Sequence, residues 1–412
     1  MVISNIFLDK DTHYLTLSAD IAFRGKSVQR AYFKIDRKNE SLVADDASPF
    51  LAAVLLPCMK TKENIYIDGN VSAKLLQNTH AIMNLIKKWN IGLTKVKIRC
   101  RDVTHDSQMP KFVGSFFTAG VDSFYTYLKK DKTKEKITHI ILVHGFDIPL
   151  ENKSFFKEVK KTIEKVAKEE KIQPVIIETN IGHIVEQRLV WDFSHGGALG
   201  AVALFLRGGM KEVFISGAVK NNELFPYGTH PQLDKLWSTK TLSVQSIGGE
   251  YNRLEKITNV VSKSPLALKY LRVCTQNIKG NYNCSRCHKC LMTMIYLYYS
   301  QALEKAKTFD SELDLTLVKH MYYDYKLKYN RQAEVVLALL KREKREKELQ
   351  DAINYSLTQS KKPHIMKRMS QIIAQWDQNH NERRLYQFIF NMNAKEDRNM
   401  LFKFLLNRGI LK

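Results

Sequence analysis

Two kinds of apolar spacing alternate within the first hundred residues. Apolar and polar side chains occupy alternate positions in several short runs, as they do in half-buried β-strands. These strands are expected at residues 13–23, 29–35, 64–69 and 95–100. Residues 72–89 instead carry apolar side chains at helical spacing. The pattern predicts an N-terminal α+β domain over residues 1–105, and no catalytic motif stands out within it.

The pattern changes after residue 105, where short apolar runs begin to alternate with helical segments. The runs lie at residues 111–117, 138–145, 174–180 and 212–217, and residues 152–170 are a typical intervening helix. Strands that alternate with helices of this length predict βαβ crossovers, a mainly parallel sheet and an α/β fold. Because ligands bind at the carboxyl ends of such strands, the loops that follow them are the places to search for function.

The last part of the chain shows helical spacing without strand patterns. Helices are expected within residues 317–357 and 383–409. A chain of 412 residues is too long for one small core. We therefore expect an N-terminal α+β domain at 1–105, a catalytic sheet domain at 106–302 and a basic helical C-terminal region at 303–412.

The chain is strongly basic, with 65 Lys and Arg against 42 Asp and Glu and a net charge of +23. A positive field attracts phosphates, so ATP, nucleic acid and acidic proteins are all candidate partners. The excess is spread along the chain, which favours a basic solvated surface over a dedicated nucleic-acid face. No run of about 20 apolar residues occurs, so no membrane partner is expected. With no signal-peptide pattern, a cytoplasmic location is predicted.

A loop with the features of a phosphate site follows the first strand of the predicted sheet domain. An apolar strand ends at Phe116 and Phe117, small residues follow, and a helix begins near Ser123. Small residues let the backbone approach a phosphate, and the N–H groups of a helix start bind the anion. Thr118 and Ser123 add hydroxyl donors. The GxxxxGK[ST] and GxGxxG motifs are absent, so neither a P-loop NTPase nor a dinucleotide site is expected.

Four of the six cysteines crowd into a 17-residue window, in the pattern C-x9-CxxCxxC. The four are Cys274, Cys284, Cys287 and Cys290. Thiolates at CxxC spacing bind Zn²⁺ tetrahedrally, and four of them close its coordination shell. No cysteine follows as a ferredoxin-type cluster would need, so zinc is preferred over iron–sulfur. A zinc deaminase needs an H-x-E motif, which is absent. The predicted metal is therefore structural.

The two motifs together resemble one known family. The segment 118–123, Thr-Ala-Gly-Val-Asp-Ser, resembles the SGGxDS signature of the PP-loop, or N-type, ATP pyrophosphatases. It departs from that signature at Thr118, which replaces Ser, and at Ala119, which replaces Gly. With the cysteine pattern, it resembles the 7-cyano-7-deazaguanine (preQ0) synthases and the larger QueC-like proteins encoded in bacterial antiviral defence clusters. The resemblance covers residues 110–300.

This resemblance implies a Rossmann-like core of the adenine nucleotide alpha hydrolase type. It implies that a substrate carboxylate attacks the α-phosphate of ATP and that ammonia then aminates the acyl-adenylate, with release of AMP and pyrophosphate. ATP, Mg²⁺ and Zn²⁺ are the implied cofactors, and a 7-deazaguanine-type carboxylate is the implied substrate. The added outer segments favour a variant that works with a protein partner, or modifies a protein target, in a defence complex.

Site residues follow from the loops and from the resemblance. The expected ATP-binding residues are Thr118, Ala119, Gly120, Val121, Asp122, Ser123 and Asp147. The expected catalytic residues are Asp122, Ser123, Lys220 and Arg253. The expected substrate-binding residues are His195, His230, Asp234 and Trp237. The loop at residues 227–239, which carries His230, Asp234 and Trp237, could instead be an ordinary ordered surface loop. The cationic side chains Lys220 and Arg253 could instead be solvated surface residues. His195 fits a helix N-cap equally well, and no general base is evident.

Two other functions stay open. A PP-loop tRNA-modifying enzyme is favoured by the basic charge, although cysteines committed to metal argue against sulfur transfer. A non-catalytic nucleotide-binding subunit of a multi-protein complex is favoured by Ala119. Formation of AMP and pyrophosphate separates the subunit from the two enzymes, and salt-sensitive tRNA binding separates the tRNA-modifying enzyme from the carboxylate ligase.

Overall fold

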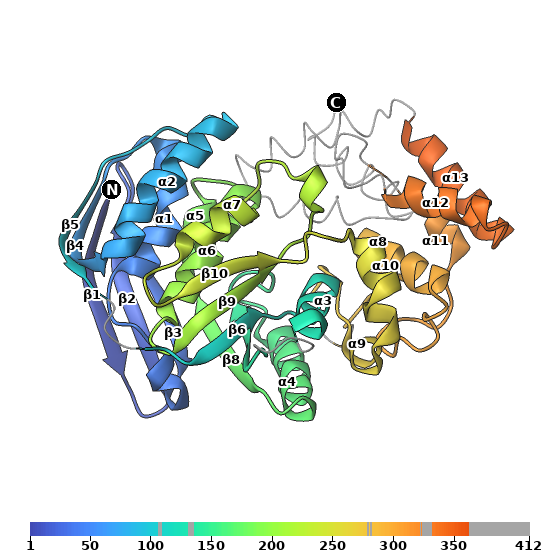
Figure 1. Cartoon of the computed structure of the whole chain (residues 1–412), viewed down its shortest axis with the longest axis horizontal. Coiled ribbons are helices and arrows are strands. Elements are labelled where there is room, and N and C mark those ends of the chain that lie inside the picture. The colour runs from blue at the N-terminus through green and yellow to red at the C-terminus, as the bar shows by residue number, and fades with distance from the viewer. Residues whose placement is uncertain are drawn as a thin grey trace, which may run out of the picture. The chain divides into compact units, whose positions relative to one another are not determined.

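The computed structural model of the chain describes residues 1–105, 109–130, 136–277, 280, 282–321, 323 and 332–361 (Figure 1). Two compact units divide the chain, Met1–Arg253 and Leu254–Lys412. Each unit is described by itself below. The helices predicted within residues 383–409 lie outside the described residues.

One ten-stranded sheet forms the centre of the first unit, in the order β10-β9-β6-β7-β8-β3-β2-β1-β4-β5. The strands are β1 (Val2–Lys10), β2 (Tyr14–Ala22), β3 (Gln29–Asp36), β4 (Ile65–Ser72), β5 (Ile98–Thr104), β6 (Phe112–Phe116), β7 (His139–His144), β8 (Gln173–Thr179), β9 (Met210–Ser216) and β10 (Ser243–Ile247). Only the three pairs from β8 to β1 are antiparallel. The other six are parallel. The predicted α/β class with a mainly parallel sheet is confirmed.

The order of the strands reverses between β6 and β9. From β6 the chain moves outward through β7 and β8, then returns across the sheet to β9 and β10. Right-handed crossovers therefore place α3 (Val121–Lys130) and α4 (Lys153–Glu169) on one face. The other face carries α5 (Ile181–Glu186), α6 (Trp191–Phe205) and α7 (Pro231–Asp234) (Figure 1). The reversal lies between β6 and β9, and open α/β sheets bind ligands at the carboxyl ends of the strands at such a point.

The N-terminal segment shares this sheet and its core. Helices α1 (Ser48–Thr61) and α2 (Ala73–Trp89) cover its strands, and α1 packs closely against α6. A Cβ on Gly197 would lie 2.8 Å from the carbonyl oxygen of Ala52. A buried ion pair joins Arg207 to Asp46, whose carboxylate also accepts a hydrogen bond from Thr104. The compact units divide the chain after Arg253, and the predicted domain boundaries at residues 105 and 302 stay predictions.

Short helices build the described part of the second unit. They are α8 (Arg253–Asn259), which begins at the last residue of the first unit, α9 (Pro265–Tyr270), α10 (His288–Tyr299), α11 (Leu315–Lys319), α12 (Gln332–Arg342) and α13 (Lys347–Lys361). The hydroxyls of Tyr298 and Tyr299 on α10 each donate 2.7 Å hydrogen bonds, to Glu346 and Glu343. These bonds hold α10 to the turn between α12 and α13.

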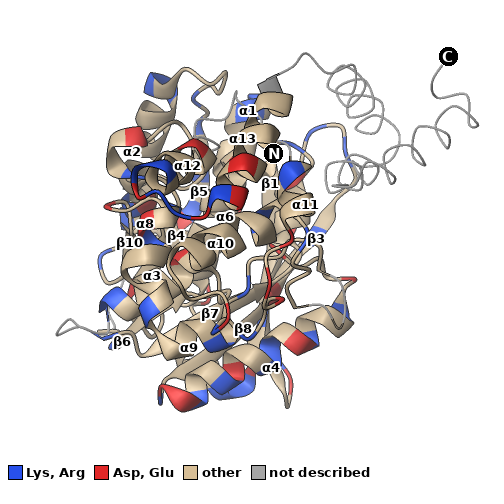
Figure 2. Ribbon diagram, turned by 90° about the vertical axis from the view of Figure 1, so that its right-hand side faces the viewer, with Lys and Arg blue, Asp and Glu red and all other residues tan. Residues whose placement is uncertain are grey.

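Residues of both charge signs occur along the folded chain. Basic and acidic side chains are interspersed on the face shown in Figure 2, including along α4. Within the described ranges, no helix combines the length and the apolar character that a membrane span requires.

Candidate functional site

The loop after β6 joins a strand to a helix, as the sequence predicted. It leaves the sheet at Phe117 and enters α3 at Val121. Ala119 is fully buried and has a φ of 58°, in the left-handed region that favours glycine. The hydroxyl of Ser123 donates to the carbonyl of Gly120 at 3.0 Å and closes the first turn of α3. A strained alanine thus stands where the resembled motif has glycine, and the backbone keeps a conformation typical of glycine.

Two predicted catalytic residues come together at the start of α3. The Nη2 atom of Arg253 lies 2.8 Å from Oδ2 of Asp122. Both side chains are partly exposed. Glu250 accepts a hydrogen bond from the Tyr125 hydroxyl at 2.5 Å and pairs with Lys129. The loop after β10 is therefore joined to α3 by charged and polar contacts on two successive turns.

A small pocket opens beside this loop, at the carboxyl ends of β9 and β10. Its walls include Gly217, Phe225, Tyr227, Thr229, Ser246 and Gly249. The N–H of Asn221 donates to the carbonyl of Gly249 at 2.6 Å, and a Cβ on Gly249 would lie 2.1 Å from Oδ1 of Asn221. A backbone hydrogen bond thus joins the loops after β9 and β10, and a larger residue at position 249 would require the Asn221 side chain to move.

His195 lies against this pocket. Its Nδ1 atom is 2.8 Å from the carbonyl oxygen of Trp191, and its Nε2 atom is 3.3 Å from the hydroxyl of Thr229. A Cβ on Gly228 would lie 2.5 Å from Nδ1, so glycine is needed for the ring to fit. Burial lowers the pKa of His195 below its usual range. The structure therefore holds a neutral imidazole in contact with a residue of the pocket wall.

The other predicted substrate residues are buried behind the pocket. His230 caps α7, where its Nδ1 accepts from the N–H of Gln232 at 3.1 Å, and its ring packs against Trp89. Asp234 and Trp237 have no exposed surface. Burial raises the pKa of Asp234 to about 7. A substrate would reach these two side chains only if the loop opened.

Lys220 and Asp147 both follow strands, as expected. Lys220 is half-buried in the loop after β9, and Asp147 is exposed in the loop after β7. Both therefore lie at the same edge of the sheet as the β6 loop. Their roles in catalysis and in ATP binding stay predictions.

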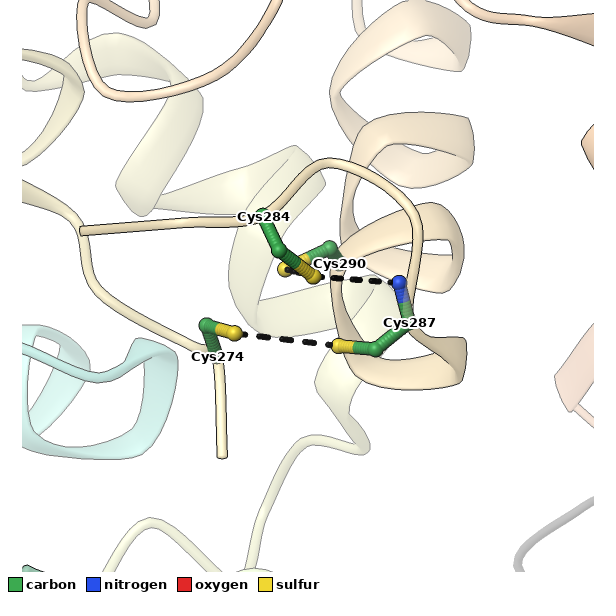
Figure 3. Close-up of side chains that lie close together, drawn as sticks. All are labelled: Cys274, Cys284, Cys287 and Cys290. Carbon is green, nitrogen blue, oxygen red and sulfur yellow. Dashed lines mark hydrogen bonds between the residues drawn. The ribbon is translucent and has the colours of Figure 1, made fainter. Parts of the chain in front are cut away.

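The four cysteines of the second unit converge on one point (Figure 3). Their sulfur atoms all lie within 4.8 Å of one another. The Cys274 and Cys287 sulfurs are 4.0 Å apart, and those of Cys284 and Cys290 are 3.9 Å apart. A tetrahedron with metal–sulfur bonds of about 2.3 Å has sulfurs about 3.8 Å apart. This cluster could hold a metal ion such as zinc.

Hydrogen bonds around the cysteines fix the two chain segments that carry them. The amide oxygen of Asn283 accepts from the N–H groups of Val273 at 2.9 Å and Cys274 at 3.1 Å. Its amide nitrogen donates to the carbonyl of Leu271 at 2.8 Å and to Thr308 at 3.0 Å. Asn283 thus fixes the position of Cys274 relative to the other three cysteines. Residues that hydrogen-bond around the ligands of a metal site have this role.

Hydrogen bonds among the four thiols also shift their pKa values in opposite directions. Hydrogen bonds from the other three thiols hold the pKa of Cys274 below its usual range. The same bonds raise the pKa of Cys287 and Cys290 above theirs, with burial adding to the effect. One thiolate therefore forms at the cost of the others. A bound divalent metal would stabilise all four in the charged state.

The sequence did not single out Thr229, Glu250 or Ser246 as site residues. Thr229 and Glu250 lie close in sequence to predicted site residues. Their hydrogen-bond partners, His195 and Tyr125, are distant in sequence, so the sequence alone gave no sign of these contacts. Comparison with protein-family models, with curated proteins and with solved structures finds no match to this chain. The resemblance to the preQ0 synthases therefore rests on the residues of the two motifs.

Proposed function

We propose that the chain is an ATP-dependent, AMP- and pyrophosphate-forming ligase of the QueC-like type. In this proposal it adenylates a carboxylate of a 7-deazaguanine-type substrate in the cytoplasm, within an antiviral defence system. The observation that carries the proposal is the left-handed Ala119. Backbone strain of this kind is kept where the surrounding structure demands it, and such positions cluster at ligand sites.

The place of this loop in the sheet supports the proposal. The loop joins β6 to α3 at the strand where the order reverses. The N–H groups at the start of α3 point toward that edge, and phosphates bind such helix starts. Neither feature depends on the family resemblance.

The proposed reaction transfers the adenylyl group in one displacement. A carboxylate oxygen forms a bond to the α-phosphorus, the bond to the β-phosphate oxygen breaks, and its electron pair leaves with pyrophosphate. An amine nitrogen then attacks the acyl carbon, and the carbon–oxygen bond breaks with its electrons leaving on AMP. Little covalent chemistry is asked of the protein, so positioning and charge neutralisation dominate.

In this reaction Arg253 would neutralise charge that develops on the α-phosphate. In the structure it pairs with Asp122, which holds its guanidinium group beside the start of α3. Mg²⁺ bound to the phosphates would neutralise further charge there, and Asp122 is its candidate protein ligand. Lys220 adds a second cation from the neighbouring strand.

For the cysteine cluster we propose a structural zinc ion. Four sulfur ligands would fill its coordination shell and leave no open position for a substrate. The zinc ion would then stabilise the folded conformation of the segment between α9 and α10. This assignment is independent of the ATP reaction, because the two sites lie in different compact units.

A product assay tests the proposed function. The purified full chain is incubated with α-labelled ATP, Mg²⁺, ammonium and 7-carboxy-7-deazaguanine, and the nucleotides are separated. We expect labelled AMP that depends on the carboxylate. ATP binding without AMP for any carboxylate tried would instead support the non-catalytic subunit, and salt-sensitive tRNA binding with tRNA-dependent AMP would support the tRNA-modifying enzyme.

A further inference from the structure

The tautomer of His195 can be assigned from its neighbours. Its Nδ1 atom lies 2.8 Å from the backbone carbonyl oxygen of Trp191, which can only accept a hydrogen bond. Nδ1 therefore carries the proton in the neutral ring, and Nε2 has a free lone pair. The atom 3.3 Å from that lone pair is the hydroxyl oxygen of Thr229. Thr229 accordingly donates its proton toward His195.

Thr229 connects this imidazole to the pocket. It lies in the pocket wall, with Ser246 of strand β10 and Gly249 of the loop that follows. The ring of Tyr227, also in the wall, meets the His195 ring edge to face at 4.8 Å. A group bound in the pocket can therefore meet the Thr229 hydroxyl, while His195 stays behind it.

The fold restricts this pair tightly. A Cβ on Gly196 would lie 1.7 Å from the carbonyl oxygen of Gly228, and a Cβ on Gly228 would lie 2.5 Å from Nδ1 of His195. The N–H of Gly228 also donates to the carbonyl of Asp192 at 2.7 Å. The start of α6 and the loop that carries Thr229 are thus in direct backbone contact, so the two side chains have little freedom to separate.

We propose that Thr229 and His195 form a proton relay that deprotonates the attacking amine. The inference rests on the proposed function, since it supplies the general base that the aminolysis of an acyl-adenylate needs. As the nitrogen–carbon bond forms, the amine proton passes to the Thr229 oxygen, and the Thr229 proton passes to Nε2 of His195. The electron pair of the breaking carbon–oxygen bond leaves on AMP, and the imidazolium later returns its proton to water.

The electrostatic environment suits this task. Burial lowers the pKa of His195, which keeps the ring neutral and able to accept a proton. The carbonyl of Trp191 opposes that shift, as do the nearby carboxylates of Asp192 and Asp147. These three groups would stabilise the imidazolium once it forms, because a positive charge is favoured beside them.

Two threonine variants test the relay. Thr229→Val keeps the shape of the side chain without its hydroxyl, and Thr229→Ser keeps the hydroxyl. With ATP, ammonium and 7-carboxy-7-deazaguanine, pyrophosphate exchange into ATP measures adenylation and amide formation measures the second step. We expect Thr229→Val to slow amide formation about 100-fold relative to exchange, and Thr229→Ser to restore it to within about tenfold. Equal slowing of both steps, or none, would overturn the relay.

A second measurement does not depend on turnover. Nitrogen-15 NMR of histidine-labelled full chain reports the tautomer and charge of His195, with His195→Gln used to assign its signals. We expect a neutral ring protonated at Nδ1 at pH 7. A ring protonated at Nε2, or a charged ring, would overturn the relay. Absence of pyrophosphate exchange in the wild-type chain would overturn the proposed function and, with it, the step that the relay serves. Exchange that persists together with the wrong tautomer would overturn the relay alone.

Discussion

The guanidinium of Arg253 lies 2.8 Å from the carboxylate of Asp122, although 131 residues separate the two in the chain. Asp122 belongs to the first turn of α3, beside the proposed phosphate loop. Arg253 follows the loop after β10. The pair brings a cation to the edge of the sheet where, in the proposed function, the α-phosphate of ATP would bind.

Asp122→Ala should remove most of the AMP-forming activity and leave the fold intact. The partly exposed ion pair contributes about 1 kcal/mol or less to the free energy of unfolding. Loss of charge positioning should instead lower the rate about 100-fold or more. The rate is measured with labelled ATP and the stability by urea unfolding. Asp9→Ala, at an exposed position on strand β1, is the matched control. Equal rates for the two variants would contradict the role assigned to Asp122.

Ala119 offers a test of backbone strain. Ala119→Gly relieves the left-handed strain but makes the unfolded chain more flexible, so its free energy of unfolding should stay within about 1 kcal/mol of the wild-type value. Ala119→Val places a branched side chain at the same φ and should cost about 2 kcal/mol or more. Urea unfolding measures both. If valine were tolerated as well as glycine, the loop would not have the described conformation.

Removal of one cysteine tests the metal centre. We expect the purified chain to hold about one zinc ion, measured by elemental analysis, and Cys287→Ser to lose it. Because metal binding and folding are coupled, the variant should also lose helical signal from the second unit. Cys100→Ser, on strand β5, is the matched control. A Cys287→Ser protein with full zinc content and unchanged helicity would contradict the assignment.

The buried carboxyl of Asp234 predicts a pH dependence of stability. Its folded pKa is about 7, raised from 3.8 by burial. Between these values the folded state binds more protons than the unfolded state, so this group's contribution falls as the pH rises from about 4 to 7 and is constant above about 7. Asp234→Asn should remove a contribution of about 4 kcal/mol at most over the whole pH range, of which about 3 kcal/mol falls between pH 5 and pH 8. Urea unfolding of both proteins at pH 5 and pH 8 measures it, and identical pH dependences would contradict the raised pKa.

Features that are continuous in sequence could be predicted from it. The proposed phosphate loop is six adjacent residues at the junction of a strand and a helix, and the cysteine pattern spans a single short segment. The helix predicted at 72–89 became α2, and the strands predicted at 13–23 and 29–35 became β2 and β3. In each case the local apolar period alone determines the element.

Elements without a clean period were not predicted. Strand β1 contains an irregularity between Ser4 and Phe7, and Asn5 there has a φ of 50°. This shift breaks the alternation by which a strand is recognised. Helix α1 is buried on nearly every side, so it shows no polar face and no helical period. It packs against α6, which lies more than a hundred residues later in the chain.

The contact between His195 and Thr229, the pair proposed as a proton relay, could not be predicted from the spacing of residues in the sequence. His195 and Thr229 lie 34 residues apart, and two glycines that permit backbone contact bring them together. The sequence placed His195 near the substrate without a partner. The structure supplies that partner, and with it a candidate base for a reaction in which the sequence suggested none.

The central claim, adenylation of a carboxylate, is tested most directly by following oxygen. The substrate is 7-carboxy-7-deazaguanine labelled with oxygen-18 in its carboxyl group, and the AMP produced with ATP and ammonium is analysed by mass spectrometry. An acyl-adenylate leaves one labelled oxygen on the phosphate of AMP, which is the result we predict. AMP that carries no label would show that its phosphate never bonded to the carboxylate, and the proposed function would then be wrong.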